Sequence, residues 1–326
     1  MEEQMINDEV MTMDKKVIKK DIGRVGWALI LYMVINYAVV LADMVWKIVA
    51  IMLQTSDEVL QEQQIEALTE SAGSMIVGVL LGVIVLYLFM SKRISVKEMF
   101  AEKKKMTAKT FFGLLSVFMA AQLLGSLFYS VLEVGLNIIG YTAQASMEAA
   151  TDASNTISMF LYASFVAPVV EELVYRGFVL ESLRKYGKVF AIIVSAILFG
   201  VMHGNIPQAV FAFGVGLVLG YVAVEYSLKW AILIHTINNF VFAELIGIVG
   251  KIFGENVELA LSGLTIYLFF FVGAAILWKK RKEISAYVEE HKEEKELYRW
   301  ALTALPMILF MVGSLLLGIL MLEPIA

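Results

Sequence analysis

Long apolar runs are the feature that most constrains this chain. Several stretches run for close to 20 residues without a charged side chain, the length a helix needs to cross the ~30 Å hydrocarbon core of a bilayer. Hydrophobic residues make up 60% and charged residues 17% of the sequence, whereas a soluble domain carries about a quarter charged residues. We therefore expect an all-α, polytopic membrane protein. A soluble enzyme, a disordered chain, a nucleic-acid binder and an outer-membrane barrel with alternating strands are excluded.

The runs predict nine transmembrane helices, at residues 25–46, 72–90, 110–139, 156–183, 188–203, 207–225, 230–249, 262–278 and 300–322. Of the 26 Lys and Arg residues, 23 precede the first span or follow an even-numbered one. Basic residues in short loops mark the cytoplasmic side. The predicted orientation is therefore N-in and C-out. The first outer loop is acidic, with Asp57, Glu58, Glu62, Glu66 and Glu70 and no basic neighbour.

Small residues suggest where these helices approach one another. Gly78 and Gly82 form a GxxxG pattern, and Gly214, Gly216 and Gly220 crowd the sixth span. Such residues let transmembrane helices pack closely, so we interpret both sets as packing positions. The chain has no cysteine, which excludes disulfides and thiolate chemistry.

Charged residues inside the fourth span carry the strongest functional signal, because a charge within the membrane is costly and usually functional. Glu172 and Arg176 are four residues apart with the acid first, the favourable arrangement for an ion pair along one helix face. Glu171 is rotated by about 100° from Glu172 and has no basic partner in its own helix. We therefore interpret Glu172 and Arg176 as a supporting pair and Glu171 as the free carboxylate.

Two of the three histidines also lie in predicted spans. His203 closes the fifth span, and His235 lies in the seventh with Asn239 one helical turn further on. The spacing predicts that the His235 imidazole and the Asn239 amide converge on one point. Asn238 is interpreted as structural, and His291, in the charged linker, as solvated.

Taken together, Glu171, His203, His235 and Asn239 supply a base for water and donors for a developing oxyanion. These groups are what amide hydrolysis requires. The helical zinc motif HExxH is absent. We expect no metal and no cofactor, although a Glu/His/His divalent-metal site remains an alternative by ligand type.

Three motifs, in order on successive spans, resemble those of the CAAX prenyl protease and bacteriocin-processing family, also called the Abi family: Glu171-Glu172-x-x-x-Arg176, Phe199-x-x-x-His203 and His235-x-x-x-Asn239. Members of this family are intramembrane glutamate endopeptidases. The resemblance covers about residues 155–247. It implies that Glu171 and His203 activate water, that His235 and Asn239 form the oxyanion site, and that Glu172 and Arg176 support them.

Depth in the membrane leaves one question open. Counting 1.5 Å per residue from the nearest cytoplasmic charge puts Glu171 about 20 Å, His203 about 22 Å and Asn239 about 15 Å deep, but His235 only about 9 Å deep. Either the loop between the sixth and seventh spans dips inward or the seventh helix tilts. The sequence does not choose between these two arrangements.

The favoured hypothesis is an intramembrane protease that cleaves a membrane-associated peptide or protein, with a prenylated C-terminus as one option for the substrate. A non-catalytic scaffold or immunity protein and a proton-coupled transporter are the alternatives. We expect a cytoplasmic segment at 1–24, accessory helices at 25–154 and a catalytic core at 155–249. Further accessory helices follow at 250–326, with a charged cytoplasmic linker at 279–299. The expected location is a prokaryotic cell membrane.

Overall fold

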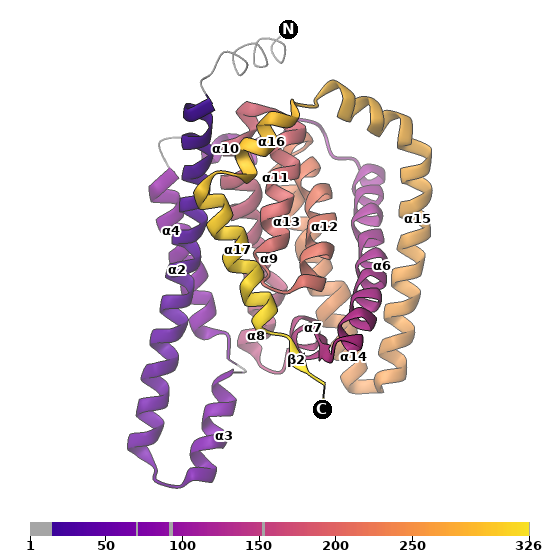
Figure 1. Cartoon of the computed structure of the whole chain (residues 1–326). Helices are drawn as coiled ribbons and strands as arrows, with labels where there is room; N and C mark the ends of the chain where they lie inside the picture. The colour runs from indigo at the N-terminus through magenta and orange to yellow at the C-terminus, as the bar shows by residue number, and fades with distance from the viewer. Residues whose placement is uncertain (1–14, 70, 91–93, 152–153, 326) are drawn as a thin grey trace.

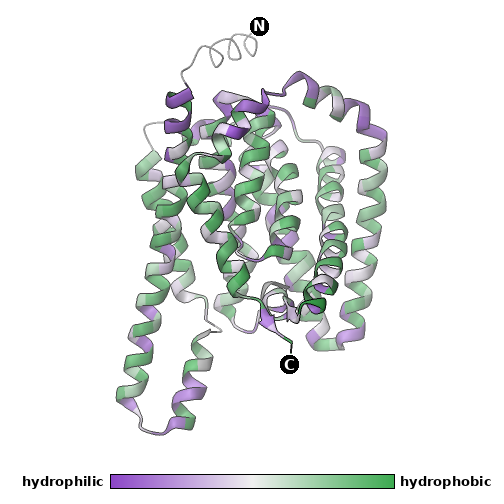
Figure 2. Cartoon of the chain, viewed as in Figure 1, coloured by the Kyte–Doolittle hydropathy of each residue, from purple (hydrophilic) through white to green (hydrophobic). Residues whose placement is uncertain are grey.

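Helices make up almost all of this fold. The computed structural model describes residues 15–69, 71–90, 94–151 and 154–325. The described chain begins at one end of the bundle and finishes near β2 at the other (Figure 1). Apolar residues cover the long helices along most of their length, and hydrophilic residues gather at the end where α2 begins (Figure 2).

Before the fourth predicted span the elements are α2 (Lys15–Gln54), α3 (Glu58–Thr69), α4 (Gly73–Met90), α5 (Val96–Phe100), α6 (Ala108–Ile138), β1 (Tyr141–Thr142) and α7 (Gln144–Thr151). The fourth span is a continuous succession of α8 (Ile157–Leu161), η1 (Tyr162–Val166), α9 (Ala167–Glu172), η2 (Leu173–Leu180), α10 (Glu181–Leu183) and η3 (Arg184–Tyr186). The remaining elements are α11 (Lys188–Val201), α12 (Ile206–Glu225), α13 (Leu228–Ile237), η4 (Asn238–Leu245), α14 (Ile246–Phe253), α15 (Glu255–Glu290), α16 (Lys295–Leu302), α17 (Leu305–Leu320) and β2 (Glu323–Pro324).

Each of the nine predicted spans corresponds to helix, which confirms an all-α, multi-pass membrane protein. Among the described residues, seven helices are long and apolar enough to cross a membrane. An eighth span results if α16 and α17, which meet at a 66° bend, are counted together. The fifth expected span, α11, has only 14 residues and is about 21 Å long, shorter than the hydrocarbon core. The N-in, C-out orientation stays a prediction.

Glycines in α4 allow it to lie against α2, as the GxxxG pattern predicts. A Cβ atom added to Gly82 would lie 2.7 Å from the ring of Tyr32, and one added to Gly78 would lie 2.6 Å from the side-chain oxygen of Asn36. These distances leave no room for a larger residue. Close packing of the two helices therefore depends on both glycines.

A second glycine contact joins α12 to the centre of the bundle. A Cβ atom on Gly216 would lie 3.2 Å from both Ala196 of α11 and the Arg176 guanidinium. Arg176 is 1% exposed and donates to the Gly216 carbonyl at 3.4 Å. The glycine thus makes space for a buried arginine, in agreement with its interpretation as a packing position.

The turn between α12 and α13 is buried beneath α5. Ser227 is fully buried, and its hydroxyl donates to the Phe100 carbonyl at 3.0 Å. The Lys103 amide donates to the Tyr226 carbonyl at 2.8 Å. The turn before α13 is therefore held in place by the segment that joins α4 to α6.

The charged end of α15 is tied to the core rather than free. The Tyr287 hydroxyl donates to Glu225 at 2.9 Å. His291 stacks on Tyr287 and lies 3.3 Å from the Lys188 ammonium through Nε2. The expectation that His291 is solvated was wrong, because the end of α15 folds over the bundle and brings this ring to α11. Glu225 also pairs with Lys104, and this hydrogen bond raises the pKa of Lys104.

Candidate active site

Two of the three helical segments that carry the candidate residues, the fourth and the seventh, depart from α-helical geometry beside them. The segments η1, η2 and η4 are π-helical, a form that is rare and frequent at functional sites. Glu171 and Glu172 lie between η1 and η2, and Asn239 lies in η4. Wider turns at these points change which side chains share a face, so α-helical spacing does not fix the geometry.

Glu172 is the centre of a buried charge cluster. Its Oε1 atom accepts a hydrogen bond from Arg176 Nη1 at 2.9 Å and lies 2.9 Å from Nδ1 of His235. The side chains of Glu172 and Arg176 are fully buried. The ion pair that helix spacing predicts is present, and the imidazole of the seventh span shares its carboxylate.

Glu171 lies next to this cluster with its carboxylate partly open. Its side chain is 20% exposed, and Oε2 is 3.8 Å from Nε2 of His235. In the described part of the chain no lysine or arginine forms an ion pair with Glu171. The two adjacent glutamates therefore differ as expected, with one held by a cation and the other available.

The tautomers of both histidines follow from their partners. His203 Nδ1 is 2.8 Å from the Phe199 carbonyl, which can only accept, so Nδ1 carries the proton and Nε2 of the neutral ring is an acceptor. His235 Nδ1 likewise faces the acceptor Glu172 and directs Nε2 toward Glu171. His235 can donate from Nε2 only as an imidazolium.

Phe199 brings the histidines and the arginine together. Its ring centroid is 5.0 Å from that of His203 and 6.0 Å from that of His235, both edge-on. The Arg176 guanidinium lies over the ring at 4.1 Å, within the range of a cation–π interaction. This side chain is 1% exposed and links all three motif-bearing helices.

Asn239 is held by a chain of amide hydrogen bonds. Its Nδ2 donates to the Ala163 carbonyl at 3.0 Å, and its Oδ1 accepts from Asn238 at 3.0 Å. Asn238 in turn accepts from Gln122 of α6 at 2.5 Å. Among the described residues His235 and Asn239 do not hydrogen-bond to each other. Each instead contacts the fourth span, one at Glu172 and the other at Ala163.

Sequence reasoning missed three contributions to this region. Gln122 supports Asn238 from a helix outside the motifs. Gly318 of α17 packs against the loop after His203, since a Cβ atom there would lie 2.8 Å from the Gly204 carbonyl. Glu244 is 4% exposed and accepts from the Ser154 amide and hydroxyl at 3.1 and 2.6 Å. Only Glu244, a carboxylate inside an apolar span, had a signal in the sequence.

Metal ligation was the alternative chemistry for this residue set. No group of three or more His, Asp or Glu side chains in the described ranges has the arrangement needed to hold a metal ion. The Nδ1 atoms of His203 and His235 are already directed at protein acceptors.

Comparison with known families bears on the same segment. Residues 153–241 match the model of the family described as type II CAAX prenyl endopeptidase Rce1-like. Over this segment the chain is similar to the CAAX prenyl protease family, which supports the resemblance carried by the three motifs. The match covers the fourth to seventh helical segments, which carry all three motifs, and supports an intramembrane CAAX-type endopeptidase activity in general. Neither the curated proteins nor the solved structures gave a match.

Proposed function

We propose that this protein is an intramembrane glutamic-type endopeptidase in which Glu171 is the general base. The observation that supports this most directly is the unequal environment of two adjacent carboxylates. Glu172 is shared by Arg176 and His235 at 2.9 Å each, whereas Glu171 is 20% exposed and lacks an arginine or lysine partner in the described chain. A base must be free to take a proton.

In the proposed reaction, Glu171 and the Nε2 lone pair of His203 bind one water molecule. Glu171 takes its proton as the oxygen adds to the carbonyl carbon of the scissile peptide. The resulting oxyanion accepts hydrogen bonds from the Asn239 amide and from Nε2 of protonated His235. Preorganised donors of this kind stabilise an oxyanion strongly. The C–N bond then breaks, and the proton held by Glu171 passes to the leaving nitrogen.

Glu172 and Arg176 support this step without touching the substrate. Glu172 fixes the His235 ring by accepting from Nδ1, and Arg176 balances its charge. Residues 155–249 form the catalytic core in this proposal, and the helices within 25–154 and 250–326 are accessory. The substrate class is a membrane-associated peptide, and the family description indicates a prenylated C-terminus. The prokaryotic location stays a prediction.

The test is cleavage of a fluorogenic prenylated peptide ending in a CAAX motif by purified protein in lipid nanodiscs. Glu171→Gln preserves shape but removes the base, and we expect no measurable turnover from it or from His203→Ala. Glu244→Gln is the matched control, because it neutralises another buried carboxylate while its amide oxygen can still accept from the Ser154 amide and its NH2 group can donate to the Ser154 hydroxyl. Full turnover by Glu171→Gln would exclude Glu171 as the base, and absence of cleavage by the wild-type protein would favour a non-catalytic scaffold.

A further inference from the structure

The first helix extends well beyond its neighbour. Tyr32 lies opposite Gly82 and Asn36 opposite Gly78, so the start of α4 at Gly73 lies opposite about residue 41. Residues 42–54 of α2 therefore extend about 20 Å beyond Gly73, the first residue of α4. The chain turns at residues 55–57, and α3 returns alongside. We call residues 42–69 the outer hairpin, and Figure 1 shows it projecting from the bundle.

One face of the outer hairpin is apolar, and no other element of the described chain covers it. The exposed fractions on α2 are 60% for Val45, 74% for Trp46, 46% for Val49, 59% for Met52 and 83% for Leu53. These positions recur at intervals of three, four and seven residues and so share one side of the helix. We call these five residues the apolar stripe.

Burial of the apolar stripe by lipid alone does not fit the geometry. The predicted span at residues 25–46 already covers about 33 Å, more than the ~30 Å hydrocarbon core, so Val49, Met52 and Leu53 of the stripe lie beyond it. Ile51, on the other side of the helix, is 8% exposed. A contiguous exposed apolar surface on a projecting element marks an interaction site.

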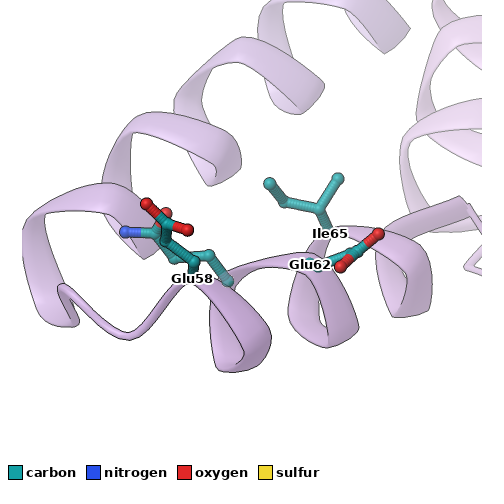
Figure 3. A pocket seen from close by; sticks show the side chains of 4 residues that line it. Glu58, Glu62 and Ile65 are labelled. Carbon is teal, nitrogen blue, oxygen red and sulfur yellow. The ribbon is translucent and has the colours of Figure 1, made fainter.

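The acidic side chains of α3, the second helix of the outer hairpin, indicate the charge of a fitting partner. Glu58 and Glu62 of α3 line a cleft of about 520 Å³ with Gln61 and Ile65 (Figure 3). The nearby Lys47 is taken by Asp43 at 2.6 Å. In the described part of the hairpin the acids of α3 have no basic partner. If two copies of this chain joined through the apolar stripe, the acidic residues of one α3 would face those of the other and repel them. Charge complementarity therefore favours a basic partner.

We propose that the outer hairpin is a docking surface for a positively charged, amphipathic helix of another membrane-associated polypeptide. Leucine-like side chains of the partner cover the apolar stripe, and its lysines or arginines reach Glu58 and Glu62. This surface lies on the side of the membrane where the chain ends, away from the cytoplasmic loops predicted by the basic residues. The inference does not depend on catalysis at Glu171.

The test uses the full chain in phosphatidylcholine nanodiscs. Because the sequence has no cysteine, Gln54→Cys gives a unique position for an environment-sensitive fluorophore beside the stripe. The probe is a synthetic amphipathic helix of leucine and lysine, and the same helix with glutamate for lysine is its charge control. We expect saturable binding of the lysine peptide, beyond that of empty nanodiscs, and none of the glutamate peptide.

Two pairs of substitutions separate the apolar and the charged contributions. Trp46→Gln with Leu53→Gln, and separately Glu58→Gln with Glu62→Gln, should each weaken binding at least tenfold. Gln63→Ala with Gln64→Ala, at exposed positions of α3, should leave binding unchanged, and thermal unfolding should be the same for all. Binding that survives both pairs overturns the proposal. So does dimerisation through the stripe, or quenching of the free protein's fluorophore by spin-labelled lipid.

Discussion

The Nδ1 atom of His235 lies 2.9 Å from Oε1 of Glu172, the same oxygen that accepts from Arg176. One buried carboxylate oxygen thus both neutralises an arginine and orients an imidazole. The two roles can be separated by mutation, because one concerns the stability of the fold and the other the direction of a ring nitrogen.

Glu172→Gln should lower both stability and activity. Removing one partner of a buried ion pair costs about 3–5 kcal/mol, whereas replacing both partners by apolar residues is often neutral. We therefore expect the double variant Glu172→Leu with Arg176→Met to recover thermal stability but not cleavage, since His235 still lacks its carboxylate. Unfolding temperature and turnover of the purified variants measure the two effects. Recovery of turnover along with stability would contradict an orienting role for Glu172.

Phe199→Leu should disturb the site through three neighbours at once. It removes the ring beneath the Arg176 guanidinium, a contact worth up to about 2 kcal/mol when desolvated, and the ring edge contacts of both histidines. We expect lower kcat with little change in KM. Phe271→Leu, at a ring that is 67% exposed, serves as the control and should behave as wild type.

Asn239→Ala should reduce kcat by roughly 10²–10³-fold if its amide stabilises the oxyanion. Gln122→Leu should have a smaller effect of the same kind, about tenfold, because Gln122 reaches Asn239 only through Asn238. KM should change little in both. A Gln122→Leu enzyme as impaired as Asn239→Ala would show instead that α6 takes part in substrate binding.

Gly318→Ala should displace the loop that carries His203. The added methyl group would lie 2.8 Å from the Gly204 carbonyl, and Gly204 holds a positive φ of 57° that favours glycine. Overpacking of this kind costs about 1–3 kcal/mol. Gly313→Ala on the same helix, with nothing within 4 Å of the added atom, should not destabilise the fold and should leave turnover unchanged.

Chelators should leave turnover unchanged if Glu171 acts without a metal. Incubation with EDTA or phenanthroline, followed by the cleavage assay, measures this directly. Loss of activity that zinc restores would favour the Glu/His/His alternative and would reassign Glu171 from base to ligand.

The sequence predicted the helical architecture well, because uninterrupted apolar runs and membrane thickness leave few alternatives. The Glu172–Arg176 pair followed from α-helical spacing and is present. The contact between His235 and Glu172 did not follow, because it depends on a buried turn under α5 that no periodicity encodes. Gln122 and Gly318 were missed for a related reason: an amide and a glycine in apolar helices carry no chemical signal until their neighbours are known.

The buried turn before α13 has a consequence for the register of the whole helix. Ser227 is anchored to Phe100, and eight positions later His235 meets Glu172. Adding a single alanine between these two anchors would swing the ring by about 100° and shift it by 1.5 Å. The number of residues between Ser227 and His235 therefore fixes the position of the His235 ring. That number is a stricter requirement for the contact with Glu172 than the identity of the apolar residues between them.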